Sequence, residues 1–177
     1  MIVDQPGSHF VFVFSSRYVY ANEHYICYKG KALTNKEYLE NWGKWVVLGT
    51  REEINIMVEK LNSYVENKQI PCIKFDRKPI KEFKNILLTE CVMCVYCDVR
   101  QSEEVWKILA NAGIKTKAWV FERETMKKWL PGGVLLENWI SERGIVGDAA
   151  EKIRKEAQDY FQTMFEDEDA IFQGIIQ

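Results

Sequence analysis

Three cysteines at regular spacing come closest to a known chemical motif in this sequence. Cys91, Cys94 and Cys97 form a C-x-x-C-x-x-C run, and thiolates at this spacing can hold an iron–sulfur cluster when they lie on a loop that wraps around it. Residues 86–99 are instead apolar, which indicates a strand with Cys91 and Cys97 on one face and Cys94 on the other. The run therefore favours buried structural cysteines. A metal or redox site that uses the three thiols is the alternative.

A basic segment begins in the strand predicted at residues 71–75. Five cations lie within eleven residues there: Lys74, Arg77, Lys78, Lys81 and Lys84. Two acidic residues oppose them, which leaves a local excess of three positive charges (five minus two). Such groups beside the mouth of a sheet could hold phosphates, and the planar guanidinium of Arg77 could bind one through two parallel hydrogen bonds. We take Lys74, Arg77 and Lys78 as candidate ligand-binding residues; the alternative is a solvated loop.

Two of the six tryptophans flank Gly43, at the start of the apolar run at residues 44–49. Trp45 is predicted to be core. Trp42 lies at the predicted helix–strand junction and is the candidate platform on which a flat ligand could stack. Packing of Trp42 in the core is the alternative, because aromatic side chains dominate cores by area.

Motifs for catalysis are lacking in the sequence. The two histidines, His9 and His24, belong to no recognisable constellation with a serine, cysteine or aspartate. No Walker loop, HExxH or GxSxG occurs. The sequence therefore favours a non-enzymatic role and implies no cofactor, although it leaves catalysis undecided.

Composition restricts the compartment and the partners. The formal net charge of −2 provides no global basic field for duplex DNA or an anionic membrane. No stretch approaches the roughly 18 apolar residues needed to cross a bilayer. The odd count of five cysteines suits a reducing compartment. A cytoplasmic protein is expected.

The predicted elements define a fold class. Capping boxes at residues 34–37, 50–53 and 148–151 predict three helix starts. Ser102 is predicted to cap a fourth helix that stops at Gly113, and residues 17–20 look β-like. Strands and helices interleave without strict alternation. We therefore expect one α+β domain over residues 1–177, with a curved, largely antiparallel sheet and helices packed on one face. A doubly wound α/β fold is the alternative, although no glycine-rich phosphate loop follows a strand.

Residues 42–122 resemble the cap-binding translation initiation factor 4E superfold, and more closely its relatives, the basophilic-leukaemia-expressed-protein-like domains. The resemblance lies in the order of several segments: Trp42-Gly43-Lys44-Trp45 entering WVVLG, a capped helix, CIKF, CVMCVYCD, SEEVWKILANAG and KAWVFE. It implies a concave sheet face that binds a nucleotide, an RNA end or another anionic small molecule. In that family tryptophans sandwich a methylated guanine and basic residues hold the phosphates, which here would place the basic segment at the phosphates.

The last residues present a separate interaction surface. An acidic run at residues 166–169 is followed by Phe172, Ile175 and Ile176. Apolar residues beyond a charged run must fold back on the core or bury against another chain. A homodimer formed through this segment is therefore one expectation, and a protein-interaction domain is a further alternative function.

Overall fold

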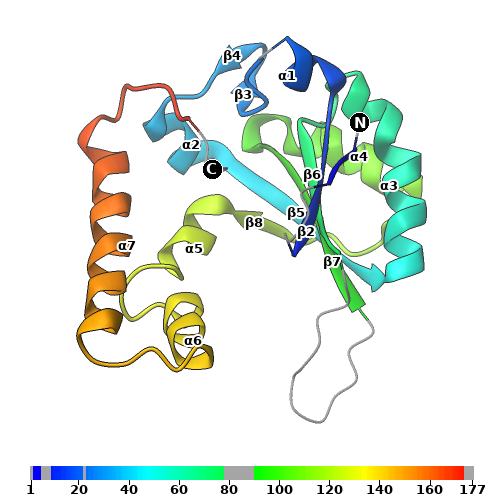
Figure 1. The fold of residues 1–177 in the computed structure, drawn as a ribbon. Helices are drawn as coiled ribbons and strands as arrows, with labels where there is room; N and C mark the ends of the chain where they lie inside the picture. The colour runs from blue at the N-terminus through cyan, green and yellow to red at the C-terminus, as the bar shows by residue number, and fades with distance from the viewer. Residues whose placement is uncertain (1, 5–8, 22, 78–89, 174–177) are drawn as a thin grey trace.

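An antiparallel sheet with helices on both of its faces organises the chain (Figure 1). The computed structural model describes residues 2–4, 9–21, 23–77 and 90–173. The strands are β1 (Ile2–Asp4), β2 (Phe10–Phe14), β3 (Cys27–Tyr28), β4 (Lys31–Ala32), β5 (Trp42–Thr50), β6 (Cys72–Asp76), β7 (Glu90–Asp98) and β8 (Trp119–Phe121). The helices are α1 (Ser16–Tyr20), α2 (Asn35–Asn41), α3 (Arg51–Glu66), a 3₁₀ turn η1 (Val99–Gln101), α4 (Ser102–Ala112), α5 (Glu122–Lys127), α6 (Val134–Glu142) and α7 (Asp148–Glu166).

The main sheet has the order β1-β2-β6-β7-β5-β8, and each neighbouring pair is antiparallel. The predicted α+β class with an antiparallel sheet is thereby confirmed. The doubly wound alternative is wrong, because it requires parallel neighbours joined by crossover helices. Strands β3 and β4 form a separate small hairpin.

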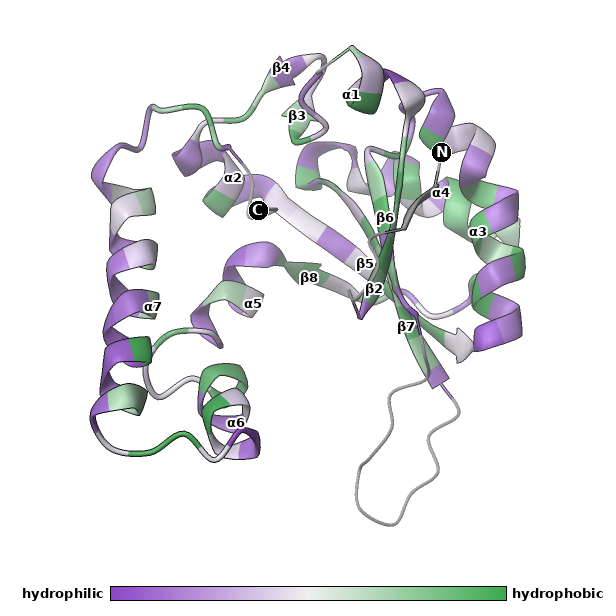
Figure 2. Cartoon of the chain, viewed as in Figure 1, coloured by the Kyte–Doolittle hydropathy of each residue, from purple (hydrophilic) through white to green (hydrophobic). Residues whose placement is uncertain are grey.

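One face of the sheet is packed against α3 and α4. Buried residues of both helices, among them Ile54, Leu61 and Leu109, join Trp45 and Val95 in a single apolar cluster. The opposite face was expected to be free of helices. It is instead partly covered by α2, α5 and α7, whose residues form a second cluster with the strands. Figure 2 shows β2, β6 and β7 as largely hydrophobic, which suits strands that pack on both faces.

Two of the three predicted capping boxes form in the structure, and the third does not. Thr34 and Thr50 form complete capping boxes with Glu37 and Glu53, as predicted. The third predicted box fails, because α7 begins at Asp148 after a Gly147 cap and has no side-chain cap bond. Residues 17–20 are helical rather than β-like: the Ser15 hydroxyl accepts a hydrogen bond from the main-chain N–H of Arg17.

The predicted cap of α4 is also wrong, because Ser102 is the first residue of the helix and does not cap it. Its hydroxyl donates to the main-chain oxygen of Val99 at 2.7 Å, and the cap position belongs to Gln101. The expected stop at Gly113 is confirmed, with a φ of 107° that favours glycine.

Helices α6 and α7 form an arm beside the sheet (Figure 1). A small apolar cluster that includes Leu136, Ile140 and Ala150 joins the two helices. Arg154 of α7 also donates two hydrogen bonds to the Glu137 carboxylate, at 3.0 and 2.6 Å. These bonds lower the pKa of Glu137 to about 2. Contacts between α6 and α7 therefore hold the arm together independently of its contacts with the sheet.

The sequence Trp42-Gly43-Lys44-Trp45 has a steric explanation. Side chains alternate along β5, so Trp42 and Lys44 face the α2 side while Gly43 and Trp45 face the α4 side. The ring of Trp119, on the neighbouring β8, lies directly over Gly43. A Cβ added at Gly43 would lie 2.4 Å from Trp119 Cζ2 and 2.9 Å from the main-chain oxygen of Val120.

Gly43→Ala is therefore expected to lower the free energy of unfolding by about 2 kcal/mol, because both Trp119 and the β8 main chain would have to move. Gly49→Ala on the same strand is the matched control. Its added Cβ would lie no closer than 3.3 Å to any atom, the nearest being a Glu53 carboxylate oxygen, so a change within about 1 kcal/mol is expected. Urea denaturation measures both. Equal losses would contradict the role assigned to the Trp119 ring.

Candidate functional site

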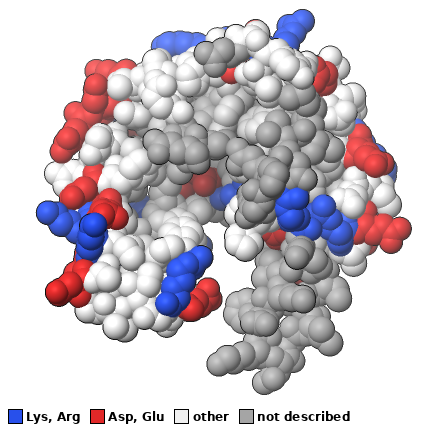
Figure 3. Space-filling view, in the orientation of Figure 1, with Lys and Arg blue, Asp and Glu red and all other residues white. Residues whose placement is uncertain are grey.

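A cavity of about 490 Å³ opens between the sheet and the helices α2, α5 and α7. Figure 3 shows a hollow beside the α5–α6 side of the molecule. Ten of the eighteen lining residues among those described are aromatic. They are Phe10, Phe12, Tyr25, Tyr38, Trp42, Tyr96, Trp129, Tyr160, Phe161 and Phe172. Two of them, Trp129 and Tyr160, are 43% and 51% exposed.

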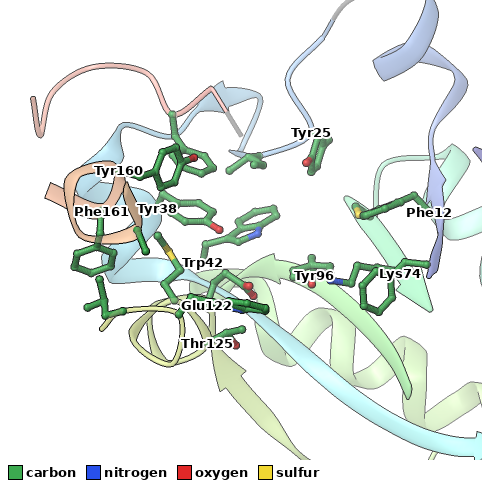
Figure 4. A pocket seen from close by; sticks show the side chains of 18 residues that line it. Phe12, Tyr25, Tyr38, Trp42, Lys74, Tyr96, Glu122, Thr125, Tyr160 and Phe161 are labelled. Carbon is green, nitrogen blue, oxygen red and sulfur yellow. The ribbon is translucent and has the colours of Figure 1, made fainter. Parts of the chain in front are cut away.

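Helix α2 and strand β5 position one end of the cavity. Tyr38 lies one turn before Trp42, and the main-chain N–H of Trp42 donates to the Tyr38 carbonyl. The two rings stack with centroids 6.4 Å apart and planes 26° apart. Figure 4 shows Tyr38, Trp42 and Glu122 at this end and Phe12 and Lys74 at the other. The predicted platform Trp42 thus lines the cavity, but only 2% of its surface is exposed, so it offers little more than an edge.

A buried ion pair lies at the Trp42 end. Strand β8 pairs Phe121 with Gly43, which brings the next residue, Glu122, beside Lys44. Lys44 Nζ donates to Glu122 Oε2 at 2.9 Å and to Thr125 Oγ1 at 3.0 Å. The two charged side chains are only 10% and 11% exposed. Glu122 and Thr125 line the cavity. Sequence analysis missed both, because no local pattern pairs a strand lysine with a glutamate 78 residues later.

Lys74 supplies a cation at the other end of the cavity. Its ammonium lies 4.1 Å from the centroid of the Phe10 ring. Within the described part of the chain Lys74 has no acidic partner, whereas the charge of Glu122 is balanced by Lys44. The described lining carries two charged residues, Lys74 and Glu122. Because Lys44, which is outside the lining, neutralises Glu122, the charge of Lys74 is left unbalanced.

The other predicted basic residues are not brought to the cavity by the described structure. Arg77 follows β6, where its main-chain N–H donates to the carbonyl of His9 at 2.9 Å. It is not among the described residues that line the cavity. Lys78, Lys81 and Lys84 lie outside the described residues.

The three regularly spaced cysteines lie on a strand, as predicted. Cys91 and Cys97 belong to the cluster under α3 and α4, whereas Cys94 faces α2 and α5, so their thiols point to opposite sides of the sheet. Burial raises the pKa of all three thiols. Among the residues that the structure describes, no group of three histidine, cysteine or carboxylate side chains is placed to hold a metal ion.

The segment after α7 completes the wall of the cavity. Phe172 is 3% exposed and stacks on Tyr38, with ring centroids 3.7 Å apart and planes 12° apart. The segment also caps α2: the main-chain N–H groups of Asn35 and Lys36 donate to the carbonyls of Ala170 and Glu168. Residues 167–173 therefore fold back on their own chain, and the homodimer expected through this segment stays a prediction.

A second cavity, of about 440 Å³, lies beside the β3–β4 hairpin. Its charged residues include Glu23 and Lys68, which form an ion pair with each other. Cys27 lies there half-buried, and its thiol hydrogen-bonds the Tyr18 hydroxyl. Because these groups already have partners, the aromatic cavity is the stronger candidate site.

Comparison of the chain with models of protein families, with curated proteins and with solved structures finds no match. The likeness to the initiation factor 4E superfold thus stays a prediction. Of the described helices, none has both the length and the apolar composition that crossing a membrane requires.

Lys44→Met is expected to lower the free energy of unfolding by about 3 kcal/mol, because it leaves the buried Glu122 carboxylate without a cation. The double variant Lys44→Met/Glu122→Leu removes both charges and is expected to recover most of that loss. Lys152→Met, which breaks an exposed pair with Glu156, is the control and should cost at most about 0.5 kcal/mol. Urea denaturation of the three variants tests this; no recovery in the double variant would contradict it.

Phe172→Ala is expected to destabilise the protein by about 3 kcal/mol, because it removes a buried ring that stacks on Tyr38. The neighbouring Ile171→Ala is the matched control. The Ile171 side chain is 39% exposed, so its truncation should cost less than about 1 kcal/mol. Thermal unfolding followed by circular dichroism compares the two. If Phe172→Ala were as stable as Ile171→Ala, packing of Phe172 on Tyr38 would not stabilise this wall of the cavity.

Proposed function

We propose that this chain is a binding protein whose aromatic cavity takes a planar ligand bearing an anionic group, of the nucleotide type. The observation that carries the proposal is the combination of an aromatic lining with Lys74, a cation that no described acidic residue neutralises. Aromatic rings offer stacking surface to a flat ligand, and an uncompensated ammonium offers a partner to a phosphate or carboxylate.

The size and enclosure of the cavity support a small ligand. A volume of about 490 Å³ lies within the range of roughly 300–1,000 Å³ typical of small-molecule sites. The exposed rings of Trp129 and Tyr160 leave stacking surface at the rim. A nucleoside monophosphate would present a flat base to these rings and its phosphate to Lys74. Catalysis is not part of the proposal, because the described lining residues include no histidine and no acid–base pair beyond the ion-paired Glu122.

The proposal also includes an initiation factor 4E-like fold for this chain. The resemblance to the initiation factor 4E superfold implies a ligand on the concave face of the sheet. Here α3 and α4 pack on one face and the cavity lies on the other. That arrangement supports the assignment, and it supports a nucleotide or an RNA end as the ligand.

Titration with nucleoside monophosphates is the direct test, read by the fluorescence of Trp42 and Trp129. Quenching that weakens with rising salt is expected, because Lys74 contributes a charge-assisted contact. Lys74→Met should weaken binding about tenfold, the effect of losing one hydrogen bond to a charged group. Lys60→Met, on the exposed side of α3, is the control and should bind as the wild type does.

The matching nucleosides, which lack the phosphate, separate stacking from charge. They should bind more weakly than the monophosphates and equally to the wild type and to Lys74→Met. If no nucleotide changes the fluorescence up to millimolar concentration, the proposal is wrong.

A further inference from the structure

The outer edge of β5 is left partly unpaired. Strand β7 pairs with all nine residues of β5, whereas β8, on the other side, pairs only with Gly43–Trp45 (Figure 1). One further bond, from the main-chain N–H of Val46 to the Ala118 carbonyl at 2.9 Å, ends this contact. The chain leaves the edge there because Ile114 is buried in the cluster under α3 and α4. No described strand lies against β5 on this side beyond Val46.

Alternation shows which main-chain groups face the open edge. In an antiparallel sheet, the N–H and C=O of one residue point to one side of the strand, and those of the next residue point to the other side. The Val46 N–H points toward β8, so both main-chain groups of Leu48 also point away from β7. The residue opposite Leu48, Val92, agrees with this, because its N–H is turned away from β5 to the Asp76 carboxylate, at 2.8 Å. Neither main-chain group of Leu48 has a hydrogen-bond partner among the described residues.

The open edge lacks the usual protection against strand pairing. Natural edge strands are blunted by a lysine, a proline, a bulge or a covering segment. Residues 46–50 read Val-Val-Leu-Gly-Thr, and their register with β7 has no bulge. The Leu48 side chain is 60% exposed. The edge ends at Thr50, whose N–H already donates to the Glu53 carboxylate. An extended chain beside Leu48 would form two main-chain hydrogen bonds and cover this side chain.

A carboxylate beside the edge favours one sign of charge in the incoming chain. Glu90 of β7 lies opposite Thr50, on the same face of the sheet as the Leu48 side chain. Glu90 is exposed and has no cationic partner in the described part of the chain. An added strand would lie about 10 Å from β7, two strand spacings, which the long side chain of a lysine or arginine opposite Thr50 can bridge. In an antiparallel strand, that residue comes two positions before the one opposite Leu48.

We propose that the edge of β5 at residues 47–50 binds an extended peptide segment of a partner protein. The segment pairs antiparallel to β5, with an apolar residue opposite Leu48 and a basic residue two positions earlier, near Glu90. This inference goes beyond the proposed function, because neither Leu48 nor Glu90 is among the described residues that line the aromatic cavity.

A synthetic peptide, acetyl-TTKTVT-amide, is the probe, and NMR of the isotope-labelled full chain is the readout. Millimolar peptide is expected to shift the main-chain amide signals of Leu48 and Gly49 and to slow hydrogen exchange of the Leu48 N–H. The same peptide with an N-methylated valine lacks the N–H that pairs with the Leu48 carbonyl, and it should not shift these signals. Replacing the peptide's lysine by glutamate should weaken binding about threefold, because it removes the ion pair with Glu90.

Two variants of the protein separate the edge from the rest of the surface. Leu48→Lys places a charge on the edge, as natural edge strands do, and should abolish the shifts. Ile56→Lys, at a position on α3 that is 47% exposed, is the matched control and should bind the peptide as the wild type does. Because both positions are exposed, both variants should keep the melting temperature of the wild type within a few degrees.

The outcomes decide the proposal. The absence of a shift at Leu48 with millimolar peptide would overturn it, and so would equal binding of the N-methylated peptide. If sedimentation shows that the free protein is a dimer and that Leu48→Lys dissociates it, a second copy occupies the edge and the peptide assignment is wrong. Nucleotide titration tests the aromatic cavity separately, so this inference and the proposed function can fail independently.

Discussion

The pairing of β5 with β7 is the constraint on which the rest of the structure depends. The two strands run antiparallel in register over nine residues, from Trp42 opposite Asp98 to Thr50 opposite Glu90. Alternation along this ladder divides their side chains between two environments. One face joins the core under α3 and α4, and the other carries Trp42, Lys44 and Tyr96 toward the cavity. A shift of one residue would exchange the two sets, so the register fixes the site as well as the core.

The polar groups of the cavity face are fixed by elements outside this ladder. Lys44 is neutralised by Glu122, which enters from the end of β8, and Tyr38 is covered by Phe172, which enters from the segment after α7. Three regions far apart in the chain therefore meet above one strand. Such an arrangement stabilises a defined concavity, because each component occupies space into which another could otherwise collapse.

Local patterns in the sequence predicted the parts of the structure that local interactions decide. The boxes at Thr34 and Thr50, the stop at Gly113 and the alternation of the three cysteines all depend on residues a few positions apart. Composition and position along the chain also predicted Trp42 and Lys74 as ligand-binding residues, and both line the cavity. The roles of Tyr38 and Glu122 could not be predicted, since their partners lie more than seventy residues away. Helix α6, which follows Pro131-Gly132-Gly133, was not predicted from the sequence, because its apolar face is buried only by packing on α7.

The capping of α2 by the segment after α7 has a consequence for biosynthesis. The carbonyls that receive the first N–H groups of α2 belong to residues 168 and 170, and the ring beside Tyr38 belongs to residue 172. A chain still emerging from the ribosome can pair β5 with β7 long before these residues exist. The sheet can therefore form during translation, whereas the cavity wall closes only after synthesis has passed residue 172. Until then the aromatic face of α2 is open to chaperones and to unintended partners.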